Sequence, residues 1–298
     1  MSTTTPQMTT HTLDVPGATL TYDILPNDTS TGEASSEPIL VLIGYPMAAA
    51  GFGSLSKHFT DRIVVTYDPR GSERSTKTDP SIQATPDDHA DDLHRVIQAI
   101  GGGPVDLFAT SGGAVNALAL ISKHPEDVRM LVAHEPPIAS VLDDREYALR
   151  ACRGVYETYQ RDGWGAGMAH FFTLISHRGP FTEELASQPG PDPAMFGMPT
   201  EDDGSRTDPM LSESVITVTH YEPDFDELRS VSTRIVLAAG ETSAGEMANR
   251  GAYAAADRLG VEPVVFPSDH GGFLGGEYGQ TGDPDAFAVR LRQVLTEA

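Results

Sequence analysis

Short, continuous apolar runs alternate with helical patterns along most of this chain, and this alternation limits the folds open to it. Residues 39–43 and 63–67 are runs of this kind, and the mostly apolar segments 105–109, 128–133, 234–239 and 262–267 continue the alternation. Strands that are apolar at every position are typical of a parallel sheet buried on both faces. The helical segments between them act as right-handed crossovers in such a sheet. The sequence therefore predicts an α/β architecture.

The segment that follows residue 84 carries helix signals at both ends. Thr85 is a predicted N-cap, Pro86 takes the first helical position, and Asp87 and Asp88 follow it. Apolar residues then recur at helical spacing until Gly101, where the helix is expected to end.

The pattern changes between residues 138 and 231, where helical stretches flank a Pro- and Gly-rich loop without strand signals. We interpret this part as a helical cap, 138–231, inserted into an α/β core of residues 12–137 and 232–298. The core is expected to begin with a hairpin whose turn is Pro16-Gly17. Residues 1–11 are expected to form a flexible tail.

The charge balance excludes several kinds of partner. The 298 residues include 20 Lys and Arg against 43 Asp and Glu, a formal net charge of -23. This charge repels phosphate backbones and anionic lipids, so we expect neither a nucleic-acid nor a membrane partner. The single cysteine, Cys152, rules out a disulfide scaffold and a cysteine-ligated zinc module. With no signal-peptide pattern and no membrane-length apolar run, we expect a cytoplasmic protein; a homodimer is left open.

The most informative segment for chemistry surrounds Ser111, where a predicted buried strand passes directly into a predicted helix. Ala109 and Gly113 are small, as a sharp strand–turn–helix connection requires. Such a turn exposes the serine hydroxyl and directs the helix N-terminus, with the N–H of Gly112 first, toward a developing oxyanion. The same residues would also suit an ordinary helix cap.

A second oxyanion donor is expected in the loop after the first central strand. Gly44 allows the backbone to turn there, and the N–H of Tyr45 is the candidate. The Tyr45 side chain could in addition line a substrate pocket.

Among ten histidines, His270 is the candidate base for Ser111. It lies in a glycine-rich loop directly after the last predicted core strand, at the sheet edge where ligand sites gather in α/β proteins. His94 and His124 are instead expected at solvated helix positions.

These segments together resemble the α/β-hydrolase superfamily over about residues 12–295. The resemblance rests on the Ser111 elbow, the Gly44-Tyr45-Pro46 loop, residues 67–75 after a strand, the helical insertion and Asp-His-Gly-Gly-Phe at 269–273, all in the family's order. It implies a mostly parallel central sheet flanked by helices and a Ser-acid-His triad. The chain departs from the family pattern at Ala109 and Ile43, neither of which is a catalytic group.

By the same resemblance, the triad acid should follow the strand at 234–239, but that site reads Gly240-Glu241-Thr242-Ser243. Some family members carry the acid after the preceding core strand, where this chain has Glu135. We therefore choose Glu135, with Glu241 as second choice and Glu246 as a further option. The alternative is that Glu135 pairs with Arg70 or caps a turn.

The sequence thus predicts a serine hydrolase that cleaves a small, largely apolar ester, thioester or lactone through an acyl-enzyme on Ser111. Apolar cap residues, among them Met168, Phe171 and Phe172, are candidates to contact the substrate, although ordinary packing would also explain each. No cofactor or metal is expected, because neither metal-ligand spacing nor a dinucleotide fingerprint occurs. Alternatives are a carbon–carbon bond hydrolase or peptidase of the same fold, or a non-catalytic ligand receptor on it.

Overall fold

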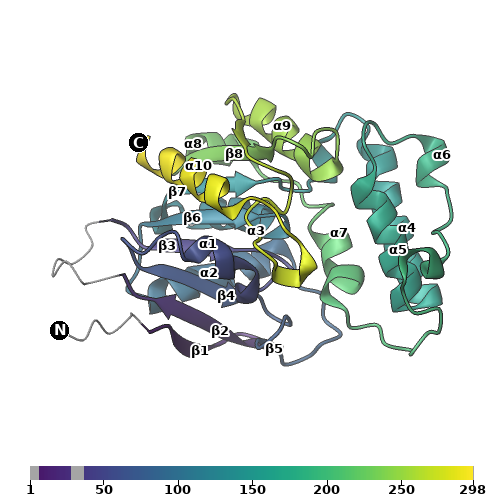
Figure 1. Cartoon of the computed structure of the whole chain (residues 1–298), viewed down its shortest axis with the longest axis horizontal. Coiled ribbons are helices and arrows are strands. Elements are labelled where there is room, and N and C mark those ends of the chain that lie inside the picture. The colour runs from purple at the N-terminus through teal and green to yellow at the C-terminus, as the bar shows by residue number, and fades with distance from the viewer. Residues whose placement is uncertain (1–6, 28–36, 298) are drawn as a thin grey trace.

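The computed structural model describes residues 7–27 and 37–297, and within these ranges the strands form one nine-stranded sheet (Figure 1). The strands are β1 (Thr9–Val15), β2 (Ala18–Leu25), β3 (Leu40–Ile43), β4 (Val64–Asp68), β5 (Thr76–Lys77), β6 (Val105–Thr110), β7 (Val128–His134), β8 (Arg234–Gly240) and β9 (Val264–Phe266). The order across the sheet is β1-β2-β4-β3-β6-β7-β8-β9, and β5 pairs with β2. The strands from β4 to β9 along this path are parallel, which confirms the predicted α/β architecture.

The first two strands form the predicted hairpin around Pro16-Gly17. Its first strand begins at Thr9, so residues 9–11 are paired with β2 and are not part of a tail as expected. Backbone pairing to a neighbouring strand fixes these residues although the sequence there carries few apolar side chains. Residues 7 and 8 precede the strand and are exposed, and residues 1–6 of the predicted tail lie outside the described residues.

Helices cover both faces of the sheet. The core helices and helical turns are η2 (Ala49–Phe52), α1 (Gly53–Ser56), α2 (Pro86–Ala99), α3 (Gly112–Lys123), η3 (Pro125–Asp127), α8 (Phe225–Ser230), α9 (Met247–Leu259), η7 (Glu277–Gly279) and α10 (Pro284–Thr296). Residues of α2, α3, α8 and α9 pack on one face of the sheet, and residues of α1 and α10 pack on the other. The predicted start of α2 is confirmed: Thr85 and Asp88 form a reciprocal capping box ahead of the helix.

The chain between β7 and β8 is largely helical and rises beyond the carboxyl edge of the sheet, on the right of Figure 1. It contains η4 (Ala139–Val141), α4 (Arg145–Asp162), α5 (Trp164–Ser176), α6 (Glu183–Ala186), η5 (Pro193–Phe196), the π-helical turn η6 (Met210–Ser214) and α7 (Val215–Thr217). These helices share a hydrophobic cluster of their own, which includes Cys152, Tyr159 and Leu211. Helix α8 falls inside the range expected for the cap, yet Phe225 and Leu228 bury it on the core.

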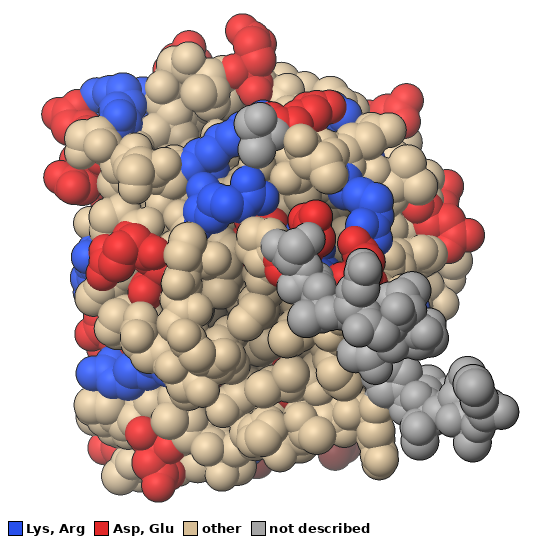
Figure 2. All heavy atoms as spheres, turned by 90° about the vertical axis from the view of Figure 1, so that its left-hand side faces the viewer, with Lys and Arg blue, Asp and Glu red and all other residues tan. Residues whose placement is uncertain are grey.

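Charged side chains of both signs are interspersed on the face of the molecule that lies opposite the helices between β7 and β8 (Figure 2). Beneath that face, the buried carboxylate of Asp106 accepts hydrogen bonds from Arg62 at 2.9 Å and from Arg129 at 2.8 and 2.9 Å. No helix within the described ranges is long and apolar enough to cross a membrane.

Candidate active site

Ser111 sits at a sharp turn between β6 and α3. Its backbone has φ 56° and ψ −132°, a left-handed conformation that an L-residue adopts at a cost of about 1–3 kcal/mol. The turn is held because the Ser111 N–H donates to the His134 carbonyl at 2.9 Å, across the neighbouring strand β7. The residue is only half-buried, so the strain serves to present the side chain at the carboxyl edge of the sheet.

Two glycines let this turn lie directly against the loop after β3. A Cβ atom on Gly112 would lie 2.6 Å from the Tyr45 carbonyl oxygen, and one on Gly113 would lie 2.8 Å from the Gly44 Cα atom. Both distances are shorter than any side chain tolerates. The loop that carries the Tyr45 N–H and the helix start that carries the Gly112 N–H are therefore in backbone contact.

Glu135 follows β7, the strand next to β6, and it is fully buried. Its φ of 47° is also left-handed, so two non-glycine residues on adjacent strand ends carry this strain. Its Oε2 atom lies 2.7 Å from Nδ1 of His270, which follows β9. The structure thus joins the predicted acid to the predicted base.

The other carboxylate oxygen of Glu135 also accepts hydrogen bonds. Oε1 accepts hydrogen bonds from the Gly240 N–H at 2.8 Å, from Asn249 Nδ2 at 3.1 Å and from the Ser243 hydroxyl. A buried carboxylate with donors on both oxygens is held in one orientation. The sequence analysis identified neither Ser243 nor Asn249 as a partner of the acid, and no pattern in the sequence marks either one.

The contacts of Glu135 set the protonation states of the pair. Burial alone would raise the pKa of Glu135, but the hydrogen bond from His270, the charge of His270 and the hydrogen bond from Ser243 hold it well below its usual range. Burial lowers the pKa of His270, and the hydrogen bond and charge of Glu135 outweigh burial, so the net pKa lies above its ordinary value. Glu135 is therefore an anion beside an imidazole that binds a proton more readily than usual.

The alternative acids have other surroundings. Glu241 is exposed, and Glu246 pairs with Arg178 at 2.9 Å. Arg70, considered as a partner of Glu135, instead forms a bidentate pair with Asp92, both contacts at 2.6 Å.

The hydroxyl of Ser111 makes no hydrogen bond to any of the residues that the structure describes, His270 included. The two residues share the carboxyl edge of the sheet, and in unliganded enzymes the bond between nucleophile and base is often long. The Nδ1 contact to Glu135 leaves Nε2 of His270 as the nitrogen that can accept a proton.

A second histidine, which the sequence analysis did not single out, lies beneath this site. The ring of His134 is 6.0 Å from that of His270, and its Nδ1 is 3.0 Å from the Thr110 hydroxyl. Burial lowers the pKa of His134 to about 4, so it stays neutral at physiological pH and adds no positive charge next to His270.

The residues expected to contact substrate occupy different surroundings. Tyr45 is almost fully buried, and its hydroxyl donates to Glu213 of η6. Met168 lies within the hydrophobic cluster of the helices between β7 and β8, and Phe171 and Phe172 pack on that cluster while staying partly exposed.

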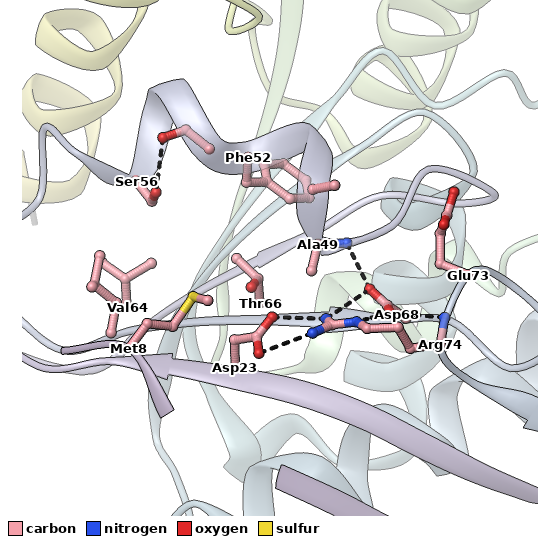
Figure 3. Close-up of a pocket in the computed structure, with 13 residues that line it drawn as sticks. Met8, Asp23, Ala49, Phe52, Ser56, Val64, Thr66, Asp68, Glu73 and Arg74 are labelled. Carbon is pink, nitrogen blue, oxygen red and sulfur yellow. Dashed lines mark hydrogen bonds and ion pairs between the residues drawn. The ribbon is translucent and has the colours of Figure 1, made fainter. Parts of the chain in front are cut away.

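A cavity of about 420 Å³ lies on the flank of the sheet, away from this site (Figure 3). Neither Ser111 nor His270 lines it. Its polar end is an ion-pair network in which Arg74 contacts Asp23 at 2.7 Å and Asp68 at 2.6 Å, and Asp68 also accepts the Ala49 N–H at 3.0 Å. These contacts brace the loop after β4.

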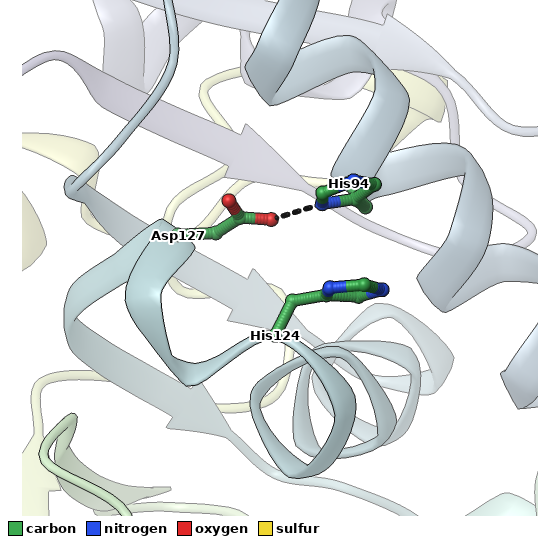
Figure 4. Close-up of side chains that lie close together, drawn as sticks. All are labelled: His94, His124 and Asp127. Atoms are coloured by element: carbon green, nitrogen blue, oxygen red, sulfur yellow. Dashed lines mark hydrogen bonds and ion pairs between the residues drawn. The ribbon is translucent and has the colours of Figure 1, made fainter.

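One cluster in the described ranges brings three potential metal ligands together: His94, His124 and Asp127 (Figure 4). His94 Nδ1 lies 2.7 Å from Asp127, whose other oxygen accepts from Gln98 at 2.9 Å. The two imidazole rings stack 3.8 Å apart at 15°. Stacked rings direct their nitrogens in parallel, whereas a metal needs them to converge. The side chains of His94, on α2, and His124, between α3 and η3, are 29% and 28% exposed, so each is solvated in part, and only His94 lies within a helix.

Comparisons with known proteins identify the family and the fold. A sequence profile of the alpha/beta hydrolase fold matches residues 37–196. An uncharacterized hydrolase of Bacillus subtilis (strain 168), YraK, is 28% identical over 268 residues, which cover 88% of this chain and 89% of that protein.

Solved structures show the same fold at low identity. The enol-lactonase from Burkholderia xenovorans LB400 is 18% identical with a TM-score of 0.64, over 96% of this chain and 100% of that one. A thermophilic esterase from Thermogutta terrifontis is 18% identical with a TM-score of 0.63, over 97% and 98% of the two chains.

The fold, the strained turn at Ser111 and the matched profile together define the class of this protein, which is a hydrolase. Because the profile spans more than half of the sequence, the chain belongs to the alpha/beta hydrolase fold family.

Proposed function

We propose that this protein is a serine hydrolase that cleaves a small, largely apolar ester, thioester or lactone through an acyl-enzyme on Ser111. The observation that carries the proposal is the buried Glu135 carboxylate 2.7 Å from Nδ1 of His270, at the same sheet edge as the strained Ser111 turn. A buried carboxylate that orients an imidazole is the arrangement that activates a serine nucleophile. The names of the similar solved structures, an enol-lactonase and an esterase, support ester-type substrates.

In the proposed first half-reaction, Nε2 of His270 takes the proton from the Ser111 hydroxyl while Oγ bonds to the substrate carbonyl carbon. The carbonyl oxygen becomes an oxyanion that accepts hydrogen bonds from the N–H groups of Gly112 and Tyr45. The tetrahedral intermediate then expels the alcohol or thiol, which receives the proton from His270, and an ester to Ser111 remains.

In the second half-reaction, His270 takes a proton from water and the resulting oxygen nucleophile attacks the acyl carbon. Collapse of that intermediate returns the proton to Ser111 Oγ and releases the carboxylic acid. Glu135 keeps its charge throughout, fixes the imidazole tautomer and stabilises the imidazolium.

The apolar substrate preference rests on the cap. Met168, Phe171 and Phe172 belong to α5, and the last two keep part of their surface exposed. Apolar side chains of this kind suit the acyl or alcohol part of a small substrate and disfavour a charged one.

The experiment that tests the proposal is labelling with a fluorophosphonate probe, read by intact mass and peptide mapping, beside hydrolysis of short- and long-chain nitrophenyl esters. We expect one label per chain at Ser111, turnover of the esters, and loss of both in Ser111→Ala at unchanged thermal stability. A wild-type protein that binds an ester but neither turns it over nor takes the label would instead be a receptor on this fold.

A further inference from the structure

The side chain of Tyr45 is enclosed on three sides. It is 1% exposed, its ring lies 4.2 Å from that of His89 on α2, and its Cδ1 would be 3.1 Å from a Cβ on Gly112. On the third side its hydroxyl donates to Oε1 of Glu213. Because Tyr45 itself belongs to the loop with the candidate oxyanion donor, whatever holds its ring also holds that loop.

Glu213 comes from the cap, and it is 3% exposed. It lies in η6, which continues into α7 between the sheet and the two long cap helices (Figure 1). Its second oxygen pairs with Nζ of Lys77 on β5, and the same Nζ donates to the Ile82 carbonyl at 2.8 Å. One cap carboxylate is therefore bound to two separate parts of the core.

Because the Glu213 carboxylate is buried, it needs hydrogen-bond donors from the protein. A carboxylate removed from water is strongly destabilised unless both of its oxygens find hydrogen-bond donors. Here the donors are a phenol and an ammonium group that lie on the core. Glu213 therefore finds both donors only when the cap lies in one position relative to the core. Burial and the charge of Glu213 also raise the pKa of Tyr45 well above its ordinary value, so the phenol keeps the proton that it donates.

The structure also explains why this contact bears on chemistry. The Tyr45 carbonyl and ring touch the start of α3 at Gly112, so a shift of Tyr45 changes the spacing between the two candidate oxyanion donors. Displacements of about 1 Å at reacting groups reduce rates by about 10²-fold.

We propose that Glu213 is a positioning residue: through the Tyr45 hydroxyl it holds the oxyanion loop against Gly112, so that the oxyanion hole is complete only when the cap is seated. This inference rests on the proposed function. It assigns to the cap a role in transition-state stabilisation beyond any contact with substrate.

The test compares Tyr45→Phe, Glu213→Ala and their double variant by steady-state hydrolysis of a short-chain nitrophenyl ester. Each single variant is expected to lower kcat by about 10- to 100-fold with KM changed by less than about threefold, because the oxyanion contact forms only in the transition state. The double variant should be no slower than the slower single variant, since both remove one contact. Glu213→Gln, which keeps an acceptor for the Tyr45 hydroxyl, should retain most of kcat.

Asp208→Ala is the matched control. Asp208 accepts the N–H groups of Met210 and Leu211 at 2.9 Å and Nε1 of Trp164 at 2.9 Å, so its loss loosens the same turn without touching Tyr45. We expect it to lower the melting temperature while kcat stays within about threefold of wild type. If Asp208→Ala lowers kcat as much as Glu213→Ala, general cap stability explains the effect and the positioning role is rejected.

The outcome separates this inference from the proposed function. A wild type that neither hydrolyses esters nor labels at Ser111 rejects the function itself. An active wild type whose Tyr45→Phe and Glu213→Ala variants keep the full kcat rejects only the role of Glu213.

Discussion

Ser243 donates a hydrogen bond to Glu135 from the turn after β8, so the serine supports the carboxylate of the neighbouring strand. The family resemblance places an acid on that same turn. In this chain the turn supplies a donor, the Gly240 N–H supplies another at 2.8 Å, and the carboxylate reaches His270 from β7. The imidazole thus has an anionic partner although the later strand carries no suitable acid.

This relationship predicts that the acid can be moved between the strands. Glu135→Ala is expected to lower kcat by roughly 10³–10⁴-fold, because His270 loses its orienting anion. Adding Ser243→Asp to that variant places a carboxylate next to the vacated space. The kcat of the double variant should be at least about tenfold higher than that of Glu135→Ala. The comparison is made by steady-state ester hydrolysis. The control is Thr242→Asp in the same background, an exposed neighbour that should restore nothing; equal recovery by both would contradict the prediction.

Conservative substitutions distinguish the first and second choices of triad acid made from the sequence. Glu135→Gln should lower kcat by roughly 10³–10⁴-fold, since an amide cannot stabilise the imidazolium. Glu241→Gln changes an exposed side chain and should leave kcat within about threefold of wild type. If the order of the two effects is reversed, the acid belongs to the later strand.

The raised pKa of His270 predicts the acid limb of the pH profile. The unprotonated imidazole is the base, so kcat/KM should fall as the pH drops through a pKa that lies above the ordinary 6.5. In Glu135→Gln the charge that raises this pKa is gone, and the residual activity should persist to lower pH than in wild type. Initial rates with a neutral ester between pH 5 and pH 9 would measure the acid limb of wild type and that of Glu135→Gln. If the two limbs coincide, Glu135 is not the cause of the raised pKa of His270.

The close approach of the Ser111 turn to the loop after β3 predicts a strong effect of one methyl group. In Gly113→Ala the new Cβ would lie 2.8 Å from the Gly44 backbone. The free energy of unfolding of this variant should therefore be about 1–3 kcal/mol lower than that of wild type. Gly154→Ala on α4 is the matched control: its Cβ meets nothing closer than 3.4 Å, and a better helix former should stabilise by up to about 1 kcal/mol. Urea unfolding followed by circular dichroism measures both. Equal stability of the two variants would contradict the predicted backbone contact.

Local sequence patterns were sufficient for most of the core. Apolar runs predicted the parallel strands, Thr85 and Pro86 predicted the start of α2, and the small residues around Ser111 predicted the strand–turn–helix connection. Each of these features is decided by neighbours a few residues apart. Residues 9–11 were missed because their order comes from pairing with β2, not from their own side chains.

The sequence by itself therefore determined the alternation of strands and helices, the elbow and the candidates Ser111 and His270, because strand burial and turn geometry leave local patterns. Only the tertiary structure decided which carboxylate meets the imidazole, which donors hold it and where the Tyr45 ring points. Glu135 and His270 are 135 positions apart, and Tyr45 and Glu213 are 168 apart. Contacts over such separations depend on the order of the strands in the sheet and on how the helices between β7 and β8 pack against it. Neither can be predicted from a short stretch of sequence.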